Sequence, residues 1–379
     1  MRIVIAPDKF KGSLTSGEVA ESVAAGIRDV APDVEFSIVP VADGGEGTLD
    51  AALANGFARR ETPAHDPLGR PISAPYALRD GEAVVEMATA SGLELVDDYD
   101  RDALAATSRG TGDLIRAALD DGARRIILAI GGSASTDGGA GMLAALGARI
   151  LDDEGRDVQD GGGNLIYADR VDLSGLDPRI GETTFVLASD VDHVLLGEHG
   201  AAHVFGPQKG ADAVEVERLD AGLAAFATAL EAALGAPAGD AKNEPGAGAA
   251  GGVGYAALAV LEAERRPGVD VVVEFTRLPD AMRGASLAIT GEGSFDHQSL
   301  GGKTPMGVVR TASALGIPTL AVCGRTLLDE QVWRDAGFIA CYATSDRAPD
   351  AATSIQEAGR ILREIGADIA REVLPGLGA

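Results

Sequence analysis

Short apolar runs alternate with amphipathic stretches along most of the chain. The runs expected to be buried strands are residues 2–6, 35–42, 125–130, 286–290, 318–323 and 338–343. The first helix is expected from the capping box Thr15-Ser16-Gly17-Glu18 to about Val30. Further helices are expected at 48–53, after 141, from Pro305, near 327–336 and at 353–373. Alternation of apolar strands with helices predicts an α/β fold with parallel sheets covered by helices.

Two segments do not follow this alternation of strands and helices. Residues 62–100 hold more turn residues and short strands such as 83–87. Residues 237–254 have the composition of a linker, although a long helix is expected before them and another after them. A chain of 379 residues is long for one core, so two domains are expected.

Glycine-rich loops follow several of the expected strands. The loop at 131–141 contains five glycines between a strand and a helix, and similar loops occur at 43–47 and 291–302. Glycine lets backbone N–H groups approach an anion closely, and ligands of open α/β sheets sit beyond the carboxyl ends of the strands. These loops therefore predict anion cradles, with Ser133, Ser135 and Thr136 as added donors and Asp137 as a metal ligand or a loop-ordering group. The alternative for any one loop is a tight turn packed against a neighbour.

The standard nucleotide signatures fit poorly. Gly302-Lys303-Thr304 resembles the end of a Walker A motif, but His297 stands where that motif needs glycine. A dinucleotide fingerprint at 139–144 starts nine residues after its strand, and a second one at 246–251 follows no strand. The sequence has neither a G-x-S-x-G nucleophile elbow nor the protein-kinase motifs H-R-D and D-F-G.

Charge and composition narrow the possible partners. A net charge of −26 repels nucleic acid and anionic membranes, so neither is expected as a partner. No apolar run or leader-like segment predicts membrane insertion or export. The two cysteines form no metal or disulfide pattern. We therefore expect a cytoplasmic protein, either a monomer or a homodimer. The five lysines all lie in turn-rich loops, where a point charge can meet a phosphate or a carboxylate.

Pairs of carboxylates follow three of the expected strands. They are Asp43 with Glu46, Asp190 with Asp192, and Glu292 with Asp296. Mg²⁺ prefers one or two carboxylates together with substrate phosphate, and a phosphoryl acceptor needs a carboxylate base within reach. Any single acidic residue of this chain is more often a solvated surface group, and the five histidines are interpreted as structural.

Seven blocks occur in one order: IVIAPDKFKGSL, ADGGEGT, SRGTGDLI, IGGSASTDGGAGM, VFGPQKGA, GAAGGVGYA and ITGEGSFD. Together they resemble the bacterial glycerate kinase family of the two-domain type. The resemblance implies a Rossmann-like domain with a parallel sheet built from both chain ends, at 1–62 plus 285–379. It also implies a second α/β domain inserted at 63–284, with the active site in the cleft between the two. ATP and Mg²⁺ are the implied cofactors, and phosphorylation of D-glycerate to 2-phosphoglycerate is the implied reaction.

On this hypothesis each candidate residue receives a role. The catalytic candidates are Asp190, Asp296 and Lys11, with Asp190 the first choice for general base, and Asp190 and Asp192 are the candidate metal ligands. The substrate-binding candidates are Lys9, Asp8, Asp43, Gly44, Gly45, Ser133 and Lys209. The nucleotide-binding candidates are Gly131, Gly132, Gly138, Gly139, Gly291, Glu292, Gly293 and Lys303. Amides of 131–133 and 138–141 are expected to hold phosphate or the glycerate carboxylate.

The sequence also departs from the family pattern. Lys9 stands where serine is usual, His193 where asparagine is usual, and Ser294 where arginine is usual. A kinase forming 3-phosphoglycerate, or one acting on a related small hydroxy acid, therefore stays open. Two other classes are a nicotinamide-dependent hydroxy-acid dehydrogenase and a non-catalytic sensor of small acids.

Overall fold

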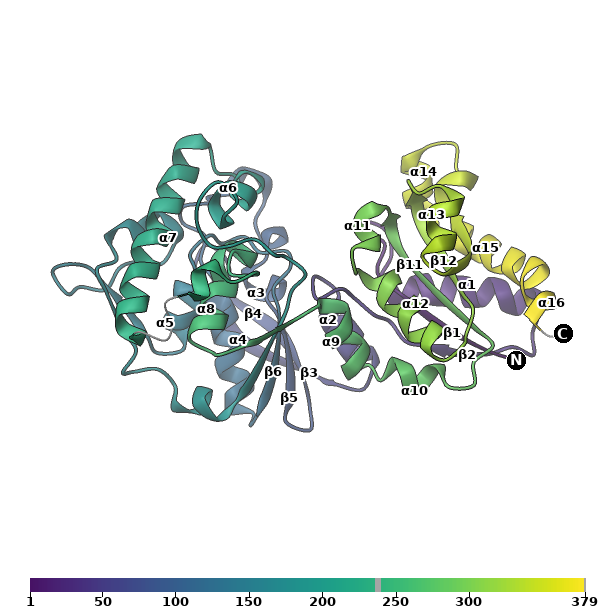
Figure 1. Ribbon diagram of the computed structural model, residues 1–379, viewed down its shortest axis with the longest axis horizontal. Helices are drawn as coiled ribbons and strands as arrows, with labels where there is room; N and C mark the ends of the chain where they lie inside the picture. Colours follow the sequence, from purple (N-terminus) through teal and green to yellow (C-terminus); the bar gives the residue numbers. More distant parts are fainter. Residues whose placement is uncertain (236–239, 378–379) are drawn as a thin grey trace. The chain divides into compact units, whose positions relative to one another are not determined.

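The computed structural model describes residues 1–235 and 240–377, which form two compact units (Figure 1). Unit 1 comprises Met1–Asp43, Asp50–Gly56 and Pro267–Ala379, and unit 2 comprises Gly44–Leu49 and Phe57–Arg266. These bounds differ from the expected boundaries at 62/63 and 284/285. Strand β3 (Ala58–His65) pairs along its whole length with β4 (Pro71–Arg79) of unit 2, and helices α9 (Gly268–Phe275) and α10 (Leu278–Met282) pack with unit 1.

Unit 1 is built on a parallel sheet of five strands to which both ends of the chain contribute. Its order is β13-β12-β11-β1-β2, with bounds Phe338–Ala343, Thr319–Thr326, Leu287–Phe295, Arg2–Pro7 and Glu35–Ile38. Helices α1 (Ser16–Val30) and α15 (Ala358–Glu372) pack together in the core on one face of the sheet. Successive β12 residues belong to different cores, Leu320 and Val322 on that face and Ala321 and Cys323 on the other. Burial on both faces explains the continuous apolar pattern of these strands, and it confirms the predicted α/β class.

The first helix begins where the capping box predicts. Thr15 Oγ1 accepts a hydrogen bond from the N–H of Glu18, and the Glu18 carboxylate accepts one from the N–H of Thr15. Two otherwise unsatisfied donors of the first turn are thereby paired.

Unit 2 contains a mixed sheet of six strands. Its order is β10-β9-β6-β5-β4-β3, and the bounds not yet given are Glu264–Arg266, Thr184–Ala188, Arg125–Ala129 and Glu82–Glu86. Strands β10, β9, β6 and β5 run parallel, whereas β4 and β3 form an antiparallel hairpin. The core around this sheet includes residues from α4 (Arg109–Asp120), α5 (Ala140–Ala145), α7 (Ala213–Leu234) and α8 (Val253–Ala259).

Shorter elements complete the two units. The remaining helices are α2 (Thr48–Ala54), α3 (Ala88–Ser91), α6 (Ala201–Phe205), α11 (His297–Leu300), α12 (Thr304–Ala314), α13 (Glu330–Asp335), α14 (Ala351–Gln356) and α16 (Leu374–Leu377). A small hairpin joins β7 (Arg149–Leu151) and β8 (Arg170–Asp172). Within the described parts of the chain, no helix combines the length and the apolar character needed to cross a bilayer.

Much of the segment expected to be a linker, residues 246–254, is packed into the core. Residues 237–239 lie outside the described residues, but Ala247, Ala249 and Val253 are fully buried. Its glycines permit close backbone contact with the glycine-rich loop at 131–141. A Cβ on Gly251 would lie 2.0 Å from the carbonyl oxygen of Ser135. The linker prediction is therefore wrong for residues 246–254, because the small residues there serve packing.

Candidate functional site

The glycine loop, residues 131–141, follows strand β6 in unit 2 and leads into α5. Gly131 lies against a second glycine-rich segment, since a Cβ on Gly131 would be 2.5 Å from the Cα of Gly45. That segment is held by Glu86 at the end of β5, which accepts hydrogen bonds from the N–H groups of Gly47 (3.2 Å) and Leu49 (2.8 Å). Because β5 and β6 are parallel neighbours, the two segments meet at the carboxyl edge of the sheet, where α/β proteins bind ligands.

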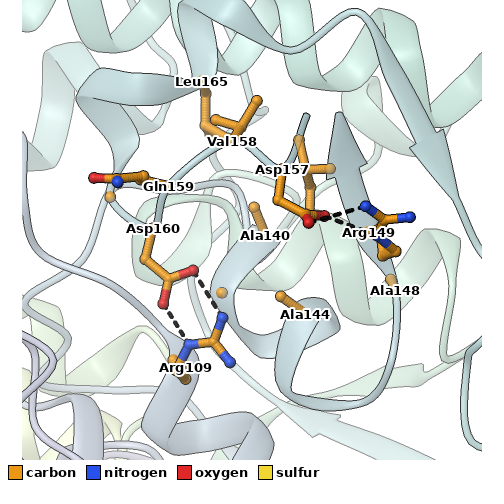
Figure 2. A pocket seen from close by; sticks show the side chains of 13 residues that line it. Arg109, Ala140, Ala144, Ala148, Arg149, Asp157, Val158, Gln159, Asp160 and Leu165 are labelled. Carbon is orange, nitrogen blue, oxygen red and sulfur yellow. Dashed lines mark hydrogen bonds and ion pairs between the residues drawn. The ribbon is translucent and has the colours of Figure 1, made fainter. Parts of the chain in front are cut away.

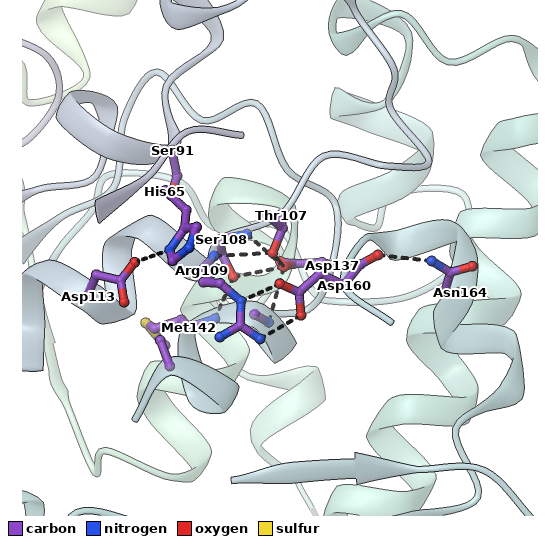
Figure 3. A network of polar contacts seen from close by, with 12 residues as sticks. His65, Ser91, Thr107, Ser108, Arg109, Asp113, Asp137, Met142, Asp160 and Asn164 are labelled. Carbon is purple, nitrogen blue, oxygen red and sulfur yellow. Dashed lines mark hydrogen bonds and ion pairs between the residues drawn. The ribbon is translucent and has the colours of Figure 1, made fainter. Parts of the chain in front are cut away.

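Asp137 organises the second half of the loop from inside (Figure 3). Its buried carboxylate accepts hydrogen bonds from the N–H and the Oγ of Ser108 (both 2.8 Å), from the N–H of Gly139 (3.1 Å) and from the N–H of Gly141 (3.2 Å). Burial raises the pKa of Asp137, and the hydrogen bonds from Ser108 and the glycine amides oppose that shift. Asp137 therefore orders the loop, which is one of its two expected roles.

The amides of 138–141 are used within the protein. The N–H of Gly138 donates to the carbonyl of Gly251 and that of Ala140 to the carbonyl of Asp137, while Gly139 and Gly141 donate to the Asp137 carboxylate. The structure thus differs from the expected phosphate contacts by 138–141, because each of these donors already has an acceptor. The N–H groups of 131–133 show no such internal acceptor among the contacts of the described residues.

Lys209 also lies beneath the loop. Its side chain is 2% exposed, and its Nζ donates to the carbonyl oxygen of Ser135. Burial lowers the pKa of Lys209 to about 7, and the nearby Asp137 carboxylate partly offsets that shift. Lys209 was expected to contact the substrate, but its ammonium group is buried and cannot reach a ligand in this arrangement. Ser133 is 9% exposed, at the edge of the loop.

A small cavity lies on the α5 side of this network (Figure 2). It has a volume of about 150 Å³, and α5 contributes Ala140, Gly141 and Ala144 to its wall. The Arg109 guanidinium forms a bidentate ion pair with Asp160 at its rim, as Figures 2 and 3 show. Of the candidate site residues, Ala140 and Gly141 line this cavity, and their N–H groups already donate to Asp137.

A cluster of acidic groups lies in unit 1, beyond the ends of β1 and near the end of β11. Asp8 directly follows β1, and its carboxylate accepts hydrogen bonds from Thr304 Oγ1 (2.8 Å) and from the N–H of Lys9 (2.7 Å). Burial, followed by the charge of Asp43, raises the pKa of Asp8 to about 8. Asp8 and Asp43, both substrate-binding candidates, are therefore brought close together.

Glu292 belongs to the same cluster. Burial raises the pKa of Glu292 to about 7; Asp43 and Asp296 act in the same direction, and Ser299 and Lys303 oppose it. Its Oε1 is buried and has no hydrogen-bond partner among the described residues. Gly291 next to it is explained by packing, since a Cβ there would lie 1.8 Å from the carbonyl oxygen of Val322. Gly293 lies beside the backbone of Lys11.

The remaining carboxylate candidates have other surroundings. Asp296 is the N-cap of α11, and its Oδ1 accepts the N–H of Gln298 at 2.8 Å. Asp190 follows β9 and is exposed. The Asp192 side chain is 79% exposed and forms an ion pair with Arg265. Among the described residues, no group of three or more His, Cys, Asp or Glu side chains is arranged to hold a metal ion.

The sequence interpretation missed three residues of these networks. Glu86 lies one residue before the end of the expected strand 83–87 and could have been selected on that ground. Ser108 begins the block SRGTGDLI, and Thr304 ends Gly302-Lys303-Thr304. Nothing in the sequence says that Ser108 meets Asp137 or that Thr304 meets Asp8. Those contacts join segments far apart in the chain.

Fold and geometry together define a two-unit α/β protein with a glycine loop and an acidic cluster at the carboxyl ends of parallel strands. The sequence matches the profile of the Glycerate kinase family over residues 3–374. It is 44% identical to the glycerate 2-kinase of Escherichia coli K12, over 90% of each chain, and 42% identical to the glycerate kinase of Bacillus subtilis 168, over 98% of each. A crystal structure of a candidate glycerate kinase 2 from Salmonella typhimurium LT2 matches with a TM-score of 0.87 and 38% identity, covering 100% of both chains. The chain belongs to the glycerate kinase family.

Proposed function

We propose that this protein transfers the γ-phosphoryl group of ATP to D-glycerate and forms 2-phosphoglycerate. The observation that carries the proposal is the family match over nearly the whole chain. The 2-position is favoured because the Escherichia coli relative, at 44% identity, is named a glycerate 2-kinase. Phosphoryl transfer depends mainly on positioning and on electrostatic stabilisation, and the glycine loop and the acidic cluster suit these two tasks.

The acidic cluster suits a magnesium nucleotide. Asp8, Asp43 and Glu292 offer the hard oxygen ligands that Mg²⁺ prefers, and the buried Glu292 Oε1 lacks a protein partner among the described residues. One or two of these carboxylates would hold the ion together with phosphate oxygens. When bound, Mg²⁺ offsets the charge of the phosphates. Lys303, whose charge acts on Glu292, would serve the same end.

The glycine loop suits an anion. The N–H groups of 131–133 and the hydroxyl of Ser133 are its donors for the glycerate carboxylate or a phosphate, while Asp137 fixes the rest of the loop. Lys9 and Lys11 in the loop after β1 would meet an anionic group of the substrate. These assignments rest on the chemistry of the donors.

Asp190 remains our proposed general base for the acceptor hydroxyl. The second candidate, Asp296, already caps a helix with the same carboxylate, which weakens its case. A base that accepts the hydroxyl proton contributes roughly 10²–10⁴-fold to turnover. Asp190→Asn should therefore lower kcat at least about 100-fold, because the amide cannot accept that proton.

The test is a coupled assay of ADP release with ATP, Mg²⁺ and D-glycerate. We expect glycerate-dependent ADP formation by the wild-type protein, loss of it with EDTA, and a strong decrease in Asp190→Asn. Asp120→Asn is the matched control, since that carboxylate is exposed, pairs with Arg179 in the same unit and has no assigned role. Absence of glycerate-dependent ADP release by the wild-type protein contradicts the proposed activity, and wild-type turnover in Asp190→Asn contradicts only the role of Asp190.

A further inference from the structure

Lys209 is the buried cation of the glycine loop. It ends the 3₁₀ turn Pro207–Lys209 and is 2% exposed, although lysine is rarely buried without a compensating contact. Its Nζ donates to the carbonyl oxygen of Ser135 in the middle of the loop. The hydroxyl groups of Ser135 and Thr136 are also buried and lack a partner among the described residues, so the ammonium lies in a polar interior.

Lys209 and Asp137 stabilise two different parts of the glycine loop. Lys209 fixes the carbonyl of Ser135, and Asp137 fixes the amides of Gly139 and Gly141 and joins the loop to Ser108 at the start of α4. The N–H of Ala134 is held separately by the carbonyl of Ser91. The peptide groups on the carboxyl side of 131–133 are thereby tied to fixed partners.

We propose that Lys209 is a positioning residue for phosphoryl transfer, which acts through the Ser135 carbonyl to hold the 131–133 amides in their anion-binding orientation. This inference rests on the proposed function. Without the ammonium, the Ser135 carbonyl is left buried without its donor, so the peptide at 135–136 can rotate and the segment before it can shift. A displacement of about 1 Å in a positioning element can lower the rate about 100-fold.

The protonation state of Lys209 gives the proposal a second readout. The pKa of Lys209 is lowered to about 7, so its charge changes near neutral pH. The charged group that acts on it is Asp137, which in turn lies near the Arg109 guanidinium of α4. A protonated amine makes the stronger hydrogen bond to a carbonyl. The wild-type rate should therefore contain a component that declines as the pH rises through about 7.

The experiment compares wild type, Lys209→Met, Lys209→Gln and Lys242→Met in steady-state kinetics with glycerate and ATP between pH 5.5 and 9.5. Lys242 is the control, because it lies in the same unit but pairs with Glu231. We expect kcat/KM of Lys209→Met to fall about 10- to 100-fold and its pH component near neutrality to disappear. Lys242→Met should keep both the wild-type kcat/KM and the wild-type pH profile.

Thermal denaturation separates positioning from folding. The inference is overturned if Lys209→Met has the kinetics and the pH profile of wild type. It is also overturned if the variant keeps the wild-type pH profile and loses activity only in proportion to the fraction of unfolded protein. If Lys209→Met does not fold, Lys209→Gln decides by the same criteria, because it keeps a polar group without the charge. A wild-type protein without glycerate-dependent ADP release contradicts the proposed function and this inference with it, whereas an active wild type with an unaffected variant contradicts the inference alone.

Discussion

Replacing Glu292 by glutamine should stabilise the protein in the absence of ligands and metal. The pKa of Glu292 is raised from 4.5 to about 7, chiefly by burial and also by the charges of Asp43 and Asp296. Between these two pH values the unfolded chain has released the proton while the folded chain retains it, so stability falls as the pH rises through this window. Glutamine has a similar shape and no charge, and it therefore removes this pH-dependent loss.

The magnitude follows from the size of the pKa shift. A shift of about 2.5 units, from 4.5 to about 7, corresponds to roughly 3 kcal/mol of unfolding free energy above pH 7. For a unit of this size, that gain corresponds to a melting temperature roughly 6–12 °C higher. Below about pH 4.5, both proteins carry a neutral side chain and should melt at nearly the same temperature.

The assay is thermal denaturation of wild type, Glu292→Gln and Glu330→Gln in EDTA from pH 4.5 to 8.5. Glu330 is the control because its carboxylate is exposed in an ion pair with Arg334, and such pairs contribute about 1 kcal/mol or less. We expect the stabilisation by Glu292→Gln to grow with pH and its kinase activity to fall. A pH-independent difference, or a variant less stable than wild type at pH 8, refutes the argument that Glu292 is held in an unfavourable charged state.

Two further substitutions test the loops. Gly131→Ala places a Cβ 2.5 Å from the Cα of Gly45, so it should lower the free energy of unfolding by about 1–3 kcal/mol in chemical denaturation and lower kcat/KM. In the control Gly181→Ala nothing lies within 4 Å of the added Cβ, so both quantities should stay at the wild-type value. Asp296→Asn should keep turnover and stability close to wild type if the carboxylate mainly caps α11, because asparagine caps equally well, while Asp296→Ala should lose about 1 kcal/mol. A turnover of Asp296→Asn reduced 100-fold would show a catalytic role instead.

Much of the fold could be predicted because the apolar pattern is strong. Buried strands such as β1 and β6 and the cap of α1 lie close to their expected positions, since parallel strands covered on both faces are apolar throughout. Strand β3 could not be recognised, because most of its residues are exposed and it shows no alternation of apolar and polar positions. The last helix is divided at Glu357 into α14 and α15, which its composition does not indicate.

The candidate site was predictable in location and much less so in detail. Glycine after a buried strand indicates where backbone approaches backbone or ligand, and both the 131–141 loop and Gly45 lie at such a place. The sequence cannot say which amides are already used, because the acceptors Asp137 and Gly251 reach the loop only in the folded chain. The burial of Lys209 was missed for the same reason, since a lysine in a loop is usually exposed.

The most direct test of the central claim is the identity of the product. Purified protein should be incubated with ATP, Mg²⁺ and D-glycerate, and the phosphorylated acid examined by phosphorus–proton correlation NMR. We predict a phosphate coupled to the single proton at carbon 2, formed in step with ADP. Coupling to the two protons at carbon 3 would contradict the proposed regiochemistry, and the absence of any phosphorylated glycerate would contradict the claim that this protein is a glycerate kinase.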